Sequence, residues 1–493
     1  MRYISTRDNH RPVPSATAID TGMVPDGGLF VPESVPPLDL PGTTDVSYAQ
    51  TATEVLRPLL SDFTEVDLAE CIARAYNPDT FDAPEVIELV PLSQRRFVME
   101  LWHGPTAAFK DVALQIMPHF VKVVKRKAGE ERHTVILVAT SGDTGKAALE
   151  GFKNCPGISI VVFYPEQGVS EIQKRQMAVT DGDNTHVVAV RGNFDDCQSG
   201  VKELFGDVEL KERLGARGFM LSSANSINWG RLSPQIVYYV HAYRMLVARG
   251  ELRAGDPVDF CVPTGNFGNI LAGYYAMCMG LPIRRLVCAS NKNRILADFF
   301  TGGVYDRNRE FHRTMSPSMD ILLSSNLERF LFETTRHDAS KVTAWYRELA
   351  ASGRFTVDDN TRAAMVRSLV PGWVDEPRVL ETIGKTYDEL GYVLDPHTAV
   401  AVAVGEDIRE RDEVPMVIDA TASPYKFSGS VLVGICGERK DDEFRSIERL
   451  HELSGVPVHR ALSDLRAKPI RHDTTIGPES MKRTVLDILG VAA

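Results

Sequence analysis

The stretch Thr134-Val-Ile-Leu-Val-Ala-Thr-Ser-Gly-Asp-Thr-Gly145 decides the fold of this chain. Its first six residues are apolar or β-branched, which is typical of a buried strand. A loop of small and polar residues follows, and a helix is expected to begin near Lys146. An almost continuously apolar strand that leads through such a loop into a helix is the repeating unit of a parallel sheet covered on both faces.

The alternation of strand and helix continues from about residue 95. Helical segments separate the apolar runs, so the sequence predicts an α/β fold. The further predicted strands are 158–163, 186–190, 258–262, 285–289 and 416–418.

The two ends of the chain differ from this pattern. Residues 1–93 are expected to form an N-terminal domain, with a turn-rich stretch at 22–32, a proline-rich loop through Pro41 and helices at 49–60 and 66–76. Residues 94–440 form the predicted main domain, in which 291–366 is less regular and more helical and is interpreted as an insertion. Residues 441–493 are predicted to form a C-terminal lobe that ends in an amphipathic helix.

Composition excludes several classes of protein. The 493 residues carry a net charge of −11 and no basic block, so nucleic-acid binding is not expected. The seven cysteines include no Cys-x-x-Cys pair, and we predict neither a disulfide framework nor a metal site. The start of the sequence shows no apolar signal core, and no apolar run is long enough for a membrane, which predicts a cytoplasmic protein with no membrane partner.

Lys110 stands out in the segment Leu101-Trp-His-Gly-Pro-Thr-Ala-Ala-Phe-Lys-Asp-Val-Ala113. A run of apolar and small residues leads to a single amine, that of Lys110. Burial lowers the pKa of a lysine and makes it a nucleophile toward an aldehyde. Pyridoxal phosphate chemistry needs such a lysine. The alternative is a surface lysine at the start of a helix.

The loop Thr140–Gly145 superficially suggests a nucleotide-binding P-loop. That motif requires a glycine where Thr140 stands and Ser or Thr where Ala147 stands, so the P-loop interpretation fails. The backbone amides and hydroxyls at a helix start suit a carboxylate or phosphate. A capped helix with a flexible entry turn is the alternative.

Two further loops follow predicted strands. In Pro263–Gly273, Gly265 and Gly268 allow close approach of an anion and the asparagines add amide donors, so a phosphate site is favoured over a structural turn. In Asp419–Phe427, the Thr421 hydroxyl would point out of the sheet end, and a turn stabilised by Thr and Ser is the default interpretation of this loop taken by itself.

A fourth polar cluster precedes the predicted helix at 234–246. Asn225, Ser226, Asn228 and Arg231 stand close together in the sequence, and the arginine could bind a phosphate through two hydrogen bonds. A solvated helix cap with a surface arginine is the alternative.

Together these motifs closely resemble the threonine synthases, pyridoxal phosphate enzymes of the tryptophan-synthase-β type. The resemblance covers nearly the whole chain. It includes the leading Tyr-x-Ser-Thr-Arg and the Pro-Asp-Gly-Gly-Leu-Phe-Val-Pro element that mark the long form with an N-terminal domain. It implies fold type II, with two parallel-sheet αβα lobes plus that domain.

The resemblance also implies the site residues. Lys110 matches the Schiff-base lysine that holds pyridoxal 5'-phosphate. The cofactor site would comprise Lys110, Gly265, Asn266, Phe267, Gly268, Asn269 and Thr421. For the substrate site, the resemblance implies Ser141, Gly142, Asp143 and Thr144. The polar cluster described above adds the candidates Asn225, Ser226, Asn228 and Arg231.

One residue departs from the family pattern. The usual Thr-Ala-His-Pro-x-Lys-Phe reads Thr421-Ala-Ser-Pro-Tyr-Lys-Phe427 here, so Ser423 replaces a histidine. Position 423 therefore offers no imidazole for catalysis. His103 is the remaining nearby candidate for a base, and the family implies instead that released phosphate activates the water.

The implied reaction converts O-phospho-L-homoserine and water into L-threonine and phosphate, in a monomer or homodimer. The residues alone support only pyridoxal phosphate chemistry on an anionic substrate. A phospho-lyase or dehydratase that releases a 2-keto acid would use the same lysine. A non-catalytic module that binds phosphometabolites is the alternative from another class.

Overall fold

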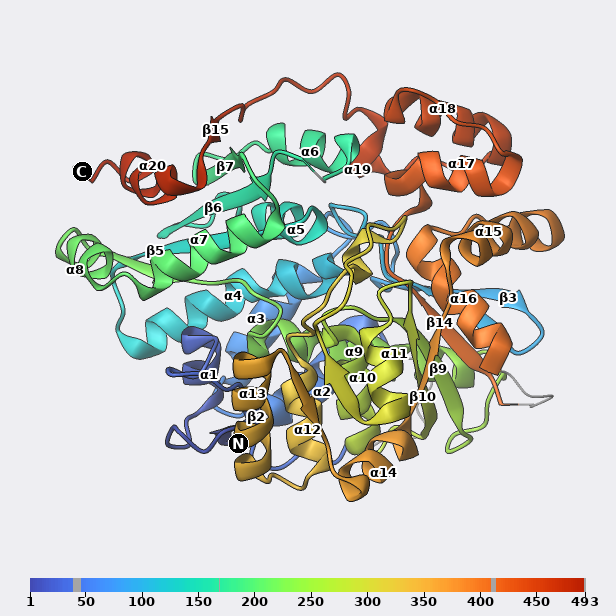
Figure 1. Ribbon diagram of the computed structural model, residues 1–493, viewed down its shortest axis with the longest axis horizontal. Coiled ribbons are helices and arrows are strands. Elements are labelled where there is room, and N and C mark those ends of the chain that lie inside the picture. The colour runs from blue at the N-terminus through green and yellow to red at the C-terminus, as the bar shows by residue number, and fades with distance from the viewer. Residues whose placement is uncertain (39–45, 168, 409–413, 492–493) are drawn as a thin grey trace.

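The computed structural model describes residues 1–38, 46–167, 169–408 and 414–491. The chain forms two α/β lobes, each built on its own sheet (Figure 1). Part of the proline-rich loop through Pro41 lies outside the described residues. Within those ranges, no helix combines the length and apolar character needed to span a membrane.

The smaller lobe is built on a five-stranded sheet in which every pairing is parallel. Alternate residues of β5, the strand between β6 and β8, face opposite ways: Val135 and Leu137 join the core under α7, and Ile136 and Val138 join the core under α4 and α5. Helices therefore cover both faces, as the apolar strands predict. The strand order is β15 (Thr475–Ile476), β7 (Thr185–Val190), β6 (Ile158–Pro165), β5 (His133–Ala139), β8 (Phe219–Ser222), and the helices are α4 (Lys110–Ala128), α5 (Asp143–Phe152), α6 (Glu171–Ala178), α7 (Phe194–Gly206), α8 (Val208–Ala216) and α20 (Met481–Ile488).

The larger lobe is built on a six-stranded sheet that is parallel except for one edge strand, β3, which pairs antiparallel with β4. Helices α9 and α10 share one core with one face of this sheet, and α15, α16 and α17 share another core with the other face. The strand order is β13 (Leu369–Trp373), β10 (Ile283–Ser290), β9 (Val258–Pro263), β14 (Met416–Ala420), β4 (Arg96–Glu100), β3 (Glu88–Ser93), and the helices are α9 (Trp229–Ala248), α10 (Gly268–Cys278), α15 (Glu376–Leu390), α16 (Pro396–Ile408) and α17 (Ser428–Cys436).

All six predicted strands are confirmed, and so are the helices expected at 49–60, 66–76 and 234–246. The sequence pattern did not predict strands β3, β4, β8, β13 and β15. Four of them, β3, β8, β13 and β15, are edge strands. In addition, β13 contains a proline and a glycine, and β15 has only two residues. Such segments carry little of the apolar periodicity on which the prediction rests.

The N-terminal segment packs against helices α4 and α9 of the main domain. Its apolar side chains belong to the same core as the larger sheet, for example Val55 with Phe120 and Trp229. The boundary expected at residue 93 falls between β3 and β4, so the division into domains stays a prediction. The elements of this segment are β1 (Tyr3–Ser5), α1 (Ser15–Thr21), β2 (Phe30–Pro32), α2 (Tyr48–Leu59) and α3 (Glu65–Ala75).

The stretch predicted as an insertion is mostly helical and carries a small antiparallel pair, β11 with β12. The C-terminal segment runs back across the smaller lobe, where β15 joins the sheet and α20 packs on α7 (Figure 1). The remaining elements are α11 (Ile295–Gly302), β11 (Val304–Asp306), η1 (Pro317–Met319), α12 (Leu327–Thr334), α13 (Ala339–Ser352), β12 (Arg354–Thr356), α14 (Asp359–Ser368), η2 (Pro424–Phe427), α18 (Glu443–Ser454), α19 (Arg460–Ser463) and η3 (Pro478–Ser480).

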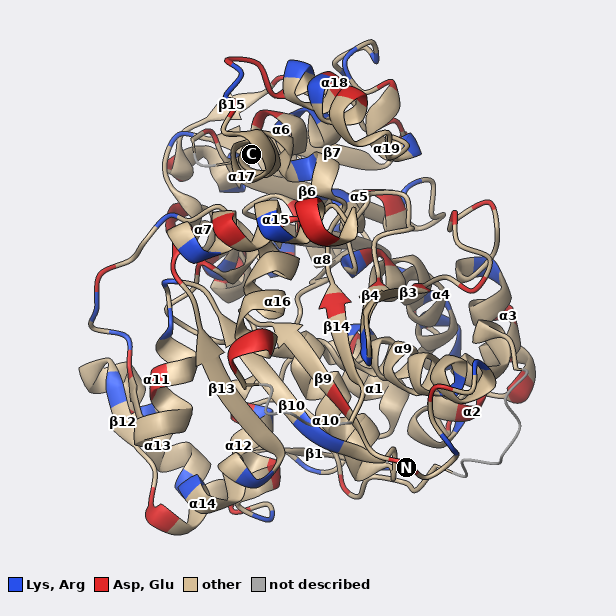
Figure 2. Cartoon of the chain, turned by 90° about the vertical axis from the view of Figure 1, so that its right-hand side faces the viewer, with Lys and Arg blue, Asp and Glu red and all other residues tan. Residues whose placement is uncertain are grey.

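Figure 2 shows that acidic and basic residues alternate along the chain in many elements, while the strands of the larger sheet are mostly uncharged. This distribution agrees with the absence of a basic block from the sequence.

Candidate active site

Lys110 is the first residue of α4 and lies where two strand ends meet. Strands β4 and β14 are parallel neighbours, so the loops that follow them leave the same edge of the sheet. An isolated antiparallel bridge between Ala108 and Ala422 joins these loops. The Ser423 amide also donates to the Ala107 carbonyl at 3.1 Å, and Ala107 has a φ of 58°, outside the usual range for alanine. The backbone therefore holds Lys110 in a fixed place.

Asp111 shapes the turn before Lys110. Its carboxylate accepts from the Thr106 amide at 2.8 Å and the Thr106 hydroxyl at 2.7 Å. Gly104 is required beside it, because an added Cβ would lie 2.4 Å from Asp111 Cβ. Burial raises the pKa of Asp111 to about 6, against the hydrogen bonds from Thr106. Asp111 is thus a structural residue of the lysine turn.

The Lys110 amine faces Asp143, the first residue of α5. Its Nζ lies 3.6 Å from Asp143 Oδ2, and only 12% of its side chain is exposed. Burial lowers the pKa of Lys110, Asp143 opposes this shift, and the charges of Lys426 and Arg231 add to it. The predicted dry surroundings of the lysine are present in the structure.

The loop Thr140–Gly145 is folded around a threonine. Thr140 Oγ1 accepts from the amides of Gly142 at 3.0 Å and Gly145 at 2.9 Å. Gly142 has a φ of 142°, and an added Cβ would lie 2.6 Å from the Gln173 side chain. Ser141 is exposed and Thr144 half-buried at the rim, so these two side chains remain the best placed for a substrate.

The second loop begins helix α10 with Phe267 in the left-handed region, at a φ of 64°. The Phe267 ring packs into the core against Phe300 and Phe330, so only its backbone could meet a phosphate. An added Cβ on Gly265 would lie 2.7 Å from the Ser318 carbonyl, which explains that glycine by protein packing. An added Cβ on Gly268 would meet only the Asn326 amide, at 3.5 Å.

Asn266 and Asn269 differ in burial. Asn266 is exposed, whereas Asn269 is buried and its Oδ1 lies 2.6 Å from the Tyr238 hydroxyl and 2.7 Å from the Tyr239 hydroxyl. Tyr239 also lies 3.0 Å from Asp419 Oδ2. The Tyr239 hydroxyl therefore lies between two acceptors, the Asn269 amide oxygen and the Asp419 carboxyl group.

Asp419 lies in β14, two residues before Thr421, and its side chain is fully buried. Burial raises the pKa of Asp419 to about 8, and the hydrogen bond from Tyr239 only partly offsets it. Burial therefore favours the protonated form of Asp419. Thr421 is also buried, at the end of the strand, where a cofactor ring could reach it.

The residues of the polar cluster that precedes α9 differ in their availability to a ligand. Arg231 is buried in the first turn of α9, where it donates to the Ala224 carbonyl at 2.8 Å, and its Nε has no partner among the described residues. Burial lowers the pKa of Arg231 to about 10, so it stays charged. An unpartnered donor on a buried cation fits an anionic ligand.

The other members of that cluster are less available. Asn228 caps α9 through its Oδ1 and donates to the Ile19 carbonyl at 2.8 Å, so the fold uses both of its polar atoms. Ser226 lies 3.3 Å from Ser325, and Asn225 is exposed.

Ser423 stands where the family has a histidine, and His103 is the remaining histidine considered as a base. The Ser423 hydroxyl is buried and has no partner within the described ranges, so it is available to a ligand. His103 Nε2 lies 3.0 Å from a Glu100 carboxylate oxygen, and its ring stacks on Trp102 at 4.4 Å. These contacts give His103 a structural role.

Sequence reasoning assigned no role to several residues around the site. Lys426 and Gln173 hold Asp143, and residues 318–326 cover the glycine loop, where Ser324 Oγ donates to the Gly265 carbonyl at 2.8 Å. Lys426 could have been found, because it is a lone cation within an apolar motif. Residues 318–326 carry no local sequence signal for this role, since their contacts with the glycine loop join positions about sixty residues apart.

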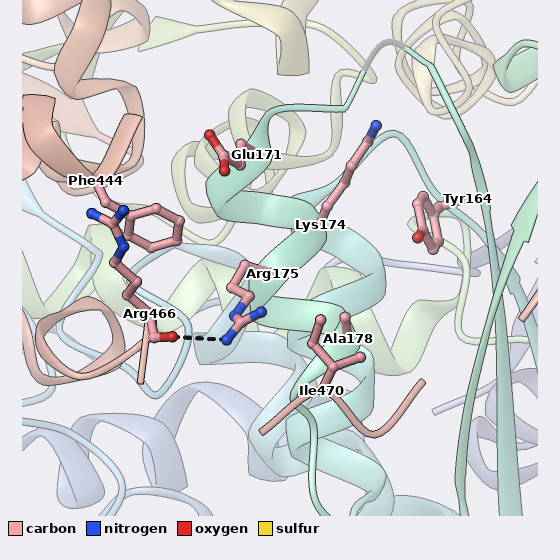
Figure 3. A pocket seen from close by; sticks show the side chains of 8 residues that line it. All are labelled: Tyr164, Glu171, Lys174, Arg175, Ala178, Phe444, Arg466 and Ile470. Carbon is pink, nitrogen blue, oxygen red and sulfur yellow. Dashed lines mark hydrogen bonds between the residues drawn. The ribbon is translucent and has the colours of Figure 1, made fainter. Parts of the chain in front are cut away.

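A hollow of about 360 Å³ lies away from this site, between α6 and the C-terminal segment (Figure 3). Its cations are already engaged: Arg175 donates to the carbonyls of Leu465, Arg466 and Lys468, and Arg466 pairs with Asp442. These contacts fasten the C-terminal segment to the smaller lobe.

Three family patterns match the chain in order. They are the threonine synthase N terminus at residues 2–76, the pyridoxal-phosphate dependent enzyme domain at 86–370, and the threonine synthase C-terminal domain at 398–469. A threonine synthase of Pseudomonas aeruginosa is 40% identical over 488 residues, which covers 95% of this chain and 100% of that protein.

The chain belongs to the threonine synthase family. The crystal structure of the pyridoxal phosphate-bound threonine synthase from Brucella melitensis has a TM-score of 0.87 and 35% identity, and each chain covers 100% of the other. The fold-type II architecture is therefore confirmed. The chain is also 40% identical to threonine synthase-like 1 of Macaca fascicularis, over 90% of this chain and 61% of that protein, and so spans about three-fifths of that relative.

The cofactor of this family is pyridoxal 5'-phosphate, and the residues present fit it. The site offers a buried amine at Lys110, a helix start at Gly268 with room beside it, and an unpartnered Ser423 hydroxyl.

Proposed function

We propose that this protein is a threonine synthase, which converts O-phospho-L-homoserine and water into L-threonine and inorganic phosphate. One observation carries the proposal: the buried Lys110 amine has one anion, Asp143, and two cations, Lys426 and Arg231, as its charged neighbours. Such surroundings favour the neutral amine, which is the form that acts as nucleophile and base.

Lys110 holds the cofactor in this proposal and, once substrate has taken its place, moves protons between substrate atoms with its free amine. When bound, pyridoxal phosphate supplies a conjugated ring that takes up the negative charge developed on the substrate carbons. The start of α10, from Gly265 to Asn269, would hold the cofactor phosphate through backbone amides. Thr421 would meet the ring nitrogen with its hydroxyl.

Arg231 gives the site its selectivity for a phosphorylated substrate. Its guanidinium is buried and has a donor to spare, so it can bind the phosphate that leaves during γ-elimination. Ser141 and Thr144 at the helix start of α5 suit the substrate carboxylate. The reaction then requires addition of water at the β-carbon.

Product analysis tests this proposal directly. The full chain is incubated with pyridoxal phosphate and O-phospho-L-homoserine, and L-threonine, phosphate and 2-keto acid are measured. Equal amounts of L-threonine and phosphate are expected. A 2-keto acid in place of threonine would identify a phospho-lyase or dehydratase, and a protein that binds no coloured cofactor would identify a non-catalytic module.

A further inference from the structure

Lys426 is a second buried lysine beside Lys110, and the reaction described above does not use it. It belongs to η2 in the larger lobe, and its side chain has no exposed surface. Its Nζ lies 2.6 Å from Asp143 Oδ1 and donates to the Thr106 carbonyl at 3.0 Å. Lysine is rarely buried so completely unless it is paired, so this pairing is a specific feature of the site.

Asp143 lies between the two lysines. Its Oδ1 accepts from Lys426 and from Gln173 Nε2 at 2.8 Å, whereas its Oδ2 lies 3.6 Å from Lys110 Nζ. The contact with Lys110 is longer than a hydrogen bond. Lys426 is therefore the cation that compensates the carboxylate.

This division of contacts bears on the chemistry of Lys110. A lone carboxylate within about 4–6 Å would stabilise the lysine as an ammonium ion, which can neither attack an aldehyde nor accept a proton. The charged groups around Lys110 are Asp143 from α5, Lys426 from η2 and Arg231 from α9. Removal of Lys426 would leave Asp143 to pair with Lys110.

We propose that Lys426 is a positioning residue that neutralises Asp143 and so keeps the Lys110 amine free to lose its proton. Lys426 acts through Asp143. The use of the Lys110 amine in a reaction rests on the proposed function. The effect of Lys426 on the protonation of that amine does not depend on the proposed function.

The experiment measures the pKa of the Lys110 amine in the full-length protein without cofactor. The rate of its acetylation by acetic anhydride is followed against pH, and the Lys110 peptide is quantified by mass spectrometry. In Lys426→Met the pKa should rise by about one pH unit or more, which lowers the labelling rate near neutral pH about tenfold. In Lys426→Arg, which keeps the charge, the pKa should stay near the wild-type value.

Asp143→Asn distinguishes this effect from a purely structural role. Added to Lys426→Met, it should reverse the rise in pKa, because the anion is gone. By itself it should lower the pKa of Lys110, because Lys426 is then left beside Lys110 without its anion, and this can be measured even if Lys426→Met does not fold. An unchanged pKa in Lys426→Met or in Asp143→Asn would overturn the proposal.

Lys146→Met is the matched control. Lys146 is also a buried lysine and lies in α5, but its carboxylate partner Glu150 also pairs with Lys153. Its loss should leave the pKa of Lys110 unchanged, and a rise equal to that in Lys426→Met would also overturn the proposal. No substrate is used, so failure to form threonine would refute the proposed function and leave this inference standing.

Discussion

The backbone amide of Phe109 donates a hydrogen bond of 2.9 Å to the carbonyl oxygen of Thr421. It joins the loop after β4 to the loop after β14 one residue before Lys110. The predicted cofactor lysine and the predicted partner of the ring nitrogen are therefore held by one small piece of backbone. A substitution that moves either loop is expected to move both groups.

Lys110→Ala should remove both cofactor absorbance and threonine formation. Lys426, the buried lysine beside it, cannot replace it without losing its own contacts with Asp143 and Thr106. Visible absorbance after incubation with pyridoxal phosphate and a product assay check this. Retention of wild-type turnover in this variant would exclude Lys110 as the cofactor lysine.

Gly268→Ala should weaken cofactor binding without harm to the fold. An added Cβ meets only Asn326 at 3.5 Å, so the free energy of unfolding should stay the same or rise by about 0.4–1 kcal/mol. Cofactor affinity should fall, because the methyl group would occupy the space beside the helix start. Titration with pyridoxal phosphate and urea unfolding measure the two effects.

Gly265→Ala is the contrasting variant. Its Cβ would lie 2.7 Å from the Ser318 carbonyl, so we expect a destabilisation of about 1–3 kcal/mol. If Gly268→Ala binds the cofactor as tightly as wild type, the phosphate is held elsewhere.

Thr421→Ala should weaken cofactor binding by about 0.5–1.5 kcal/mol, the usual contribution of one hydrogen bond. The absorbance maximum of the bound cofactor should also shift. Thr421→Ser keeps the hydroxyl and is expected to retain most of the affinity. Equal affinity and spectra in all three proteins would place Thr421 away from the ring.

Asp419 should make stability depend on pH. Burial raises its pKa to about 8 in the folded protein, from the ordinary aspartate value of 3.8. Between these values the folded state binds more protons than the unfolded state, so stability falls as pH rises and levels off above about 8. The contribution is about 1.4 kcal/mol for each pH unit.

Asp419→Asn should abolish that dependence. The amide oxygen can still accept from Tyr239 as the aspartate does, and the amide does not ionise. Urea unfolding of the cofactor-free protein at pH 6 and pH 9 should show a loss of stability in wild type that the variant lacks. A parallel loss in both proteins would mean that Asp419 is already ionised at pH 6.

The sequence predicted the parts of this protein that depend on local pattern. Strand 134–139 and its neighbours were recognisable because burial on both faces leaves a continuous apolar run, and Lys110 because small residues isolate it. The contacts of Asp143 with Lys426 and Gln173 were not predictable, since three separate elements bring these side chains together. The sequence places Phe267 in the cofactor loop but does not predict that its ring packs in the core against Phe300 and Phe330, which leaves its backbone for the cofactor.

The last prediction concerns the base that activates the water. His103 is engaged by Glu100 and stacked on Trp102, and Ser423 cannot act as a base near neutral pH. General-base work needs a group whose pKa lies near the operating pH and that is held within reach of the water. Inorganic phosphate has such a pKa, elimination releases it inside the site, and buried Arg231 has a donor to hold it.

Vinylglycine, which reaches the same unsaturated state without releasing phosphate, provides the test. Added phosphate should accelerate its conversion to L-threonine, whereas sulfate, a far weaker base of similar shape, should not. Arg231→Met should abolish the acceleration, because its loss removes the cation that would retain the anion. Equal rates of threonine formation with and without phosphate would show that a protein side chain activates the water, and the rate in His103→Gln would then be the next measurement.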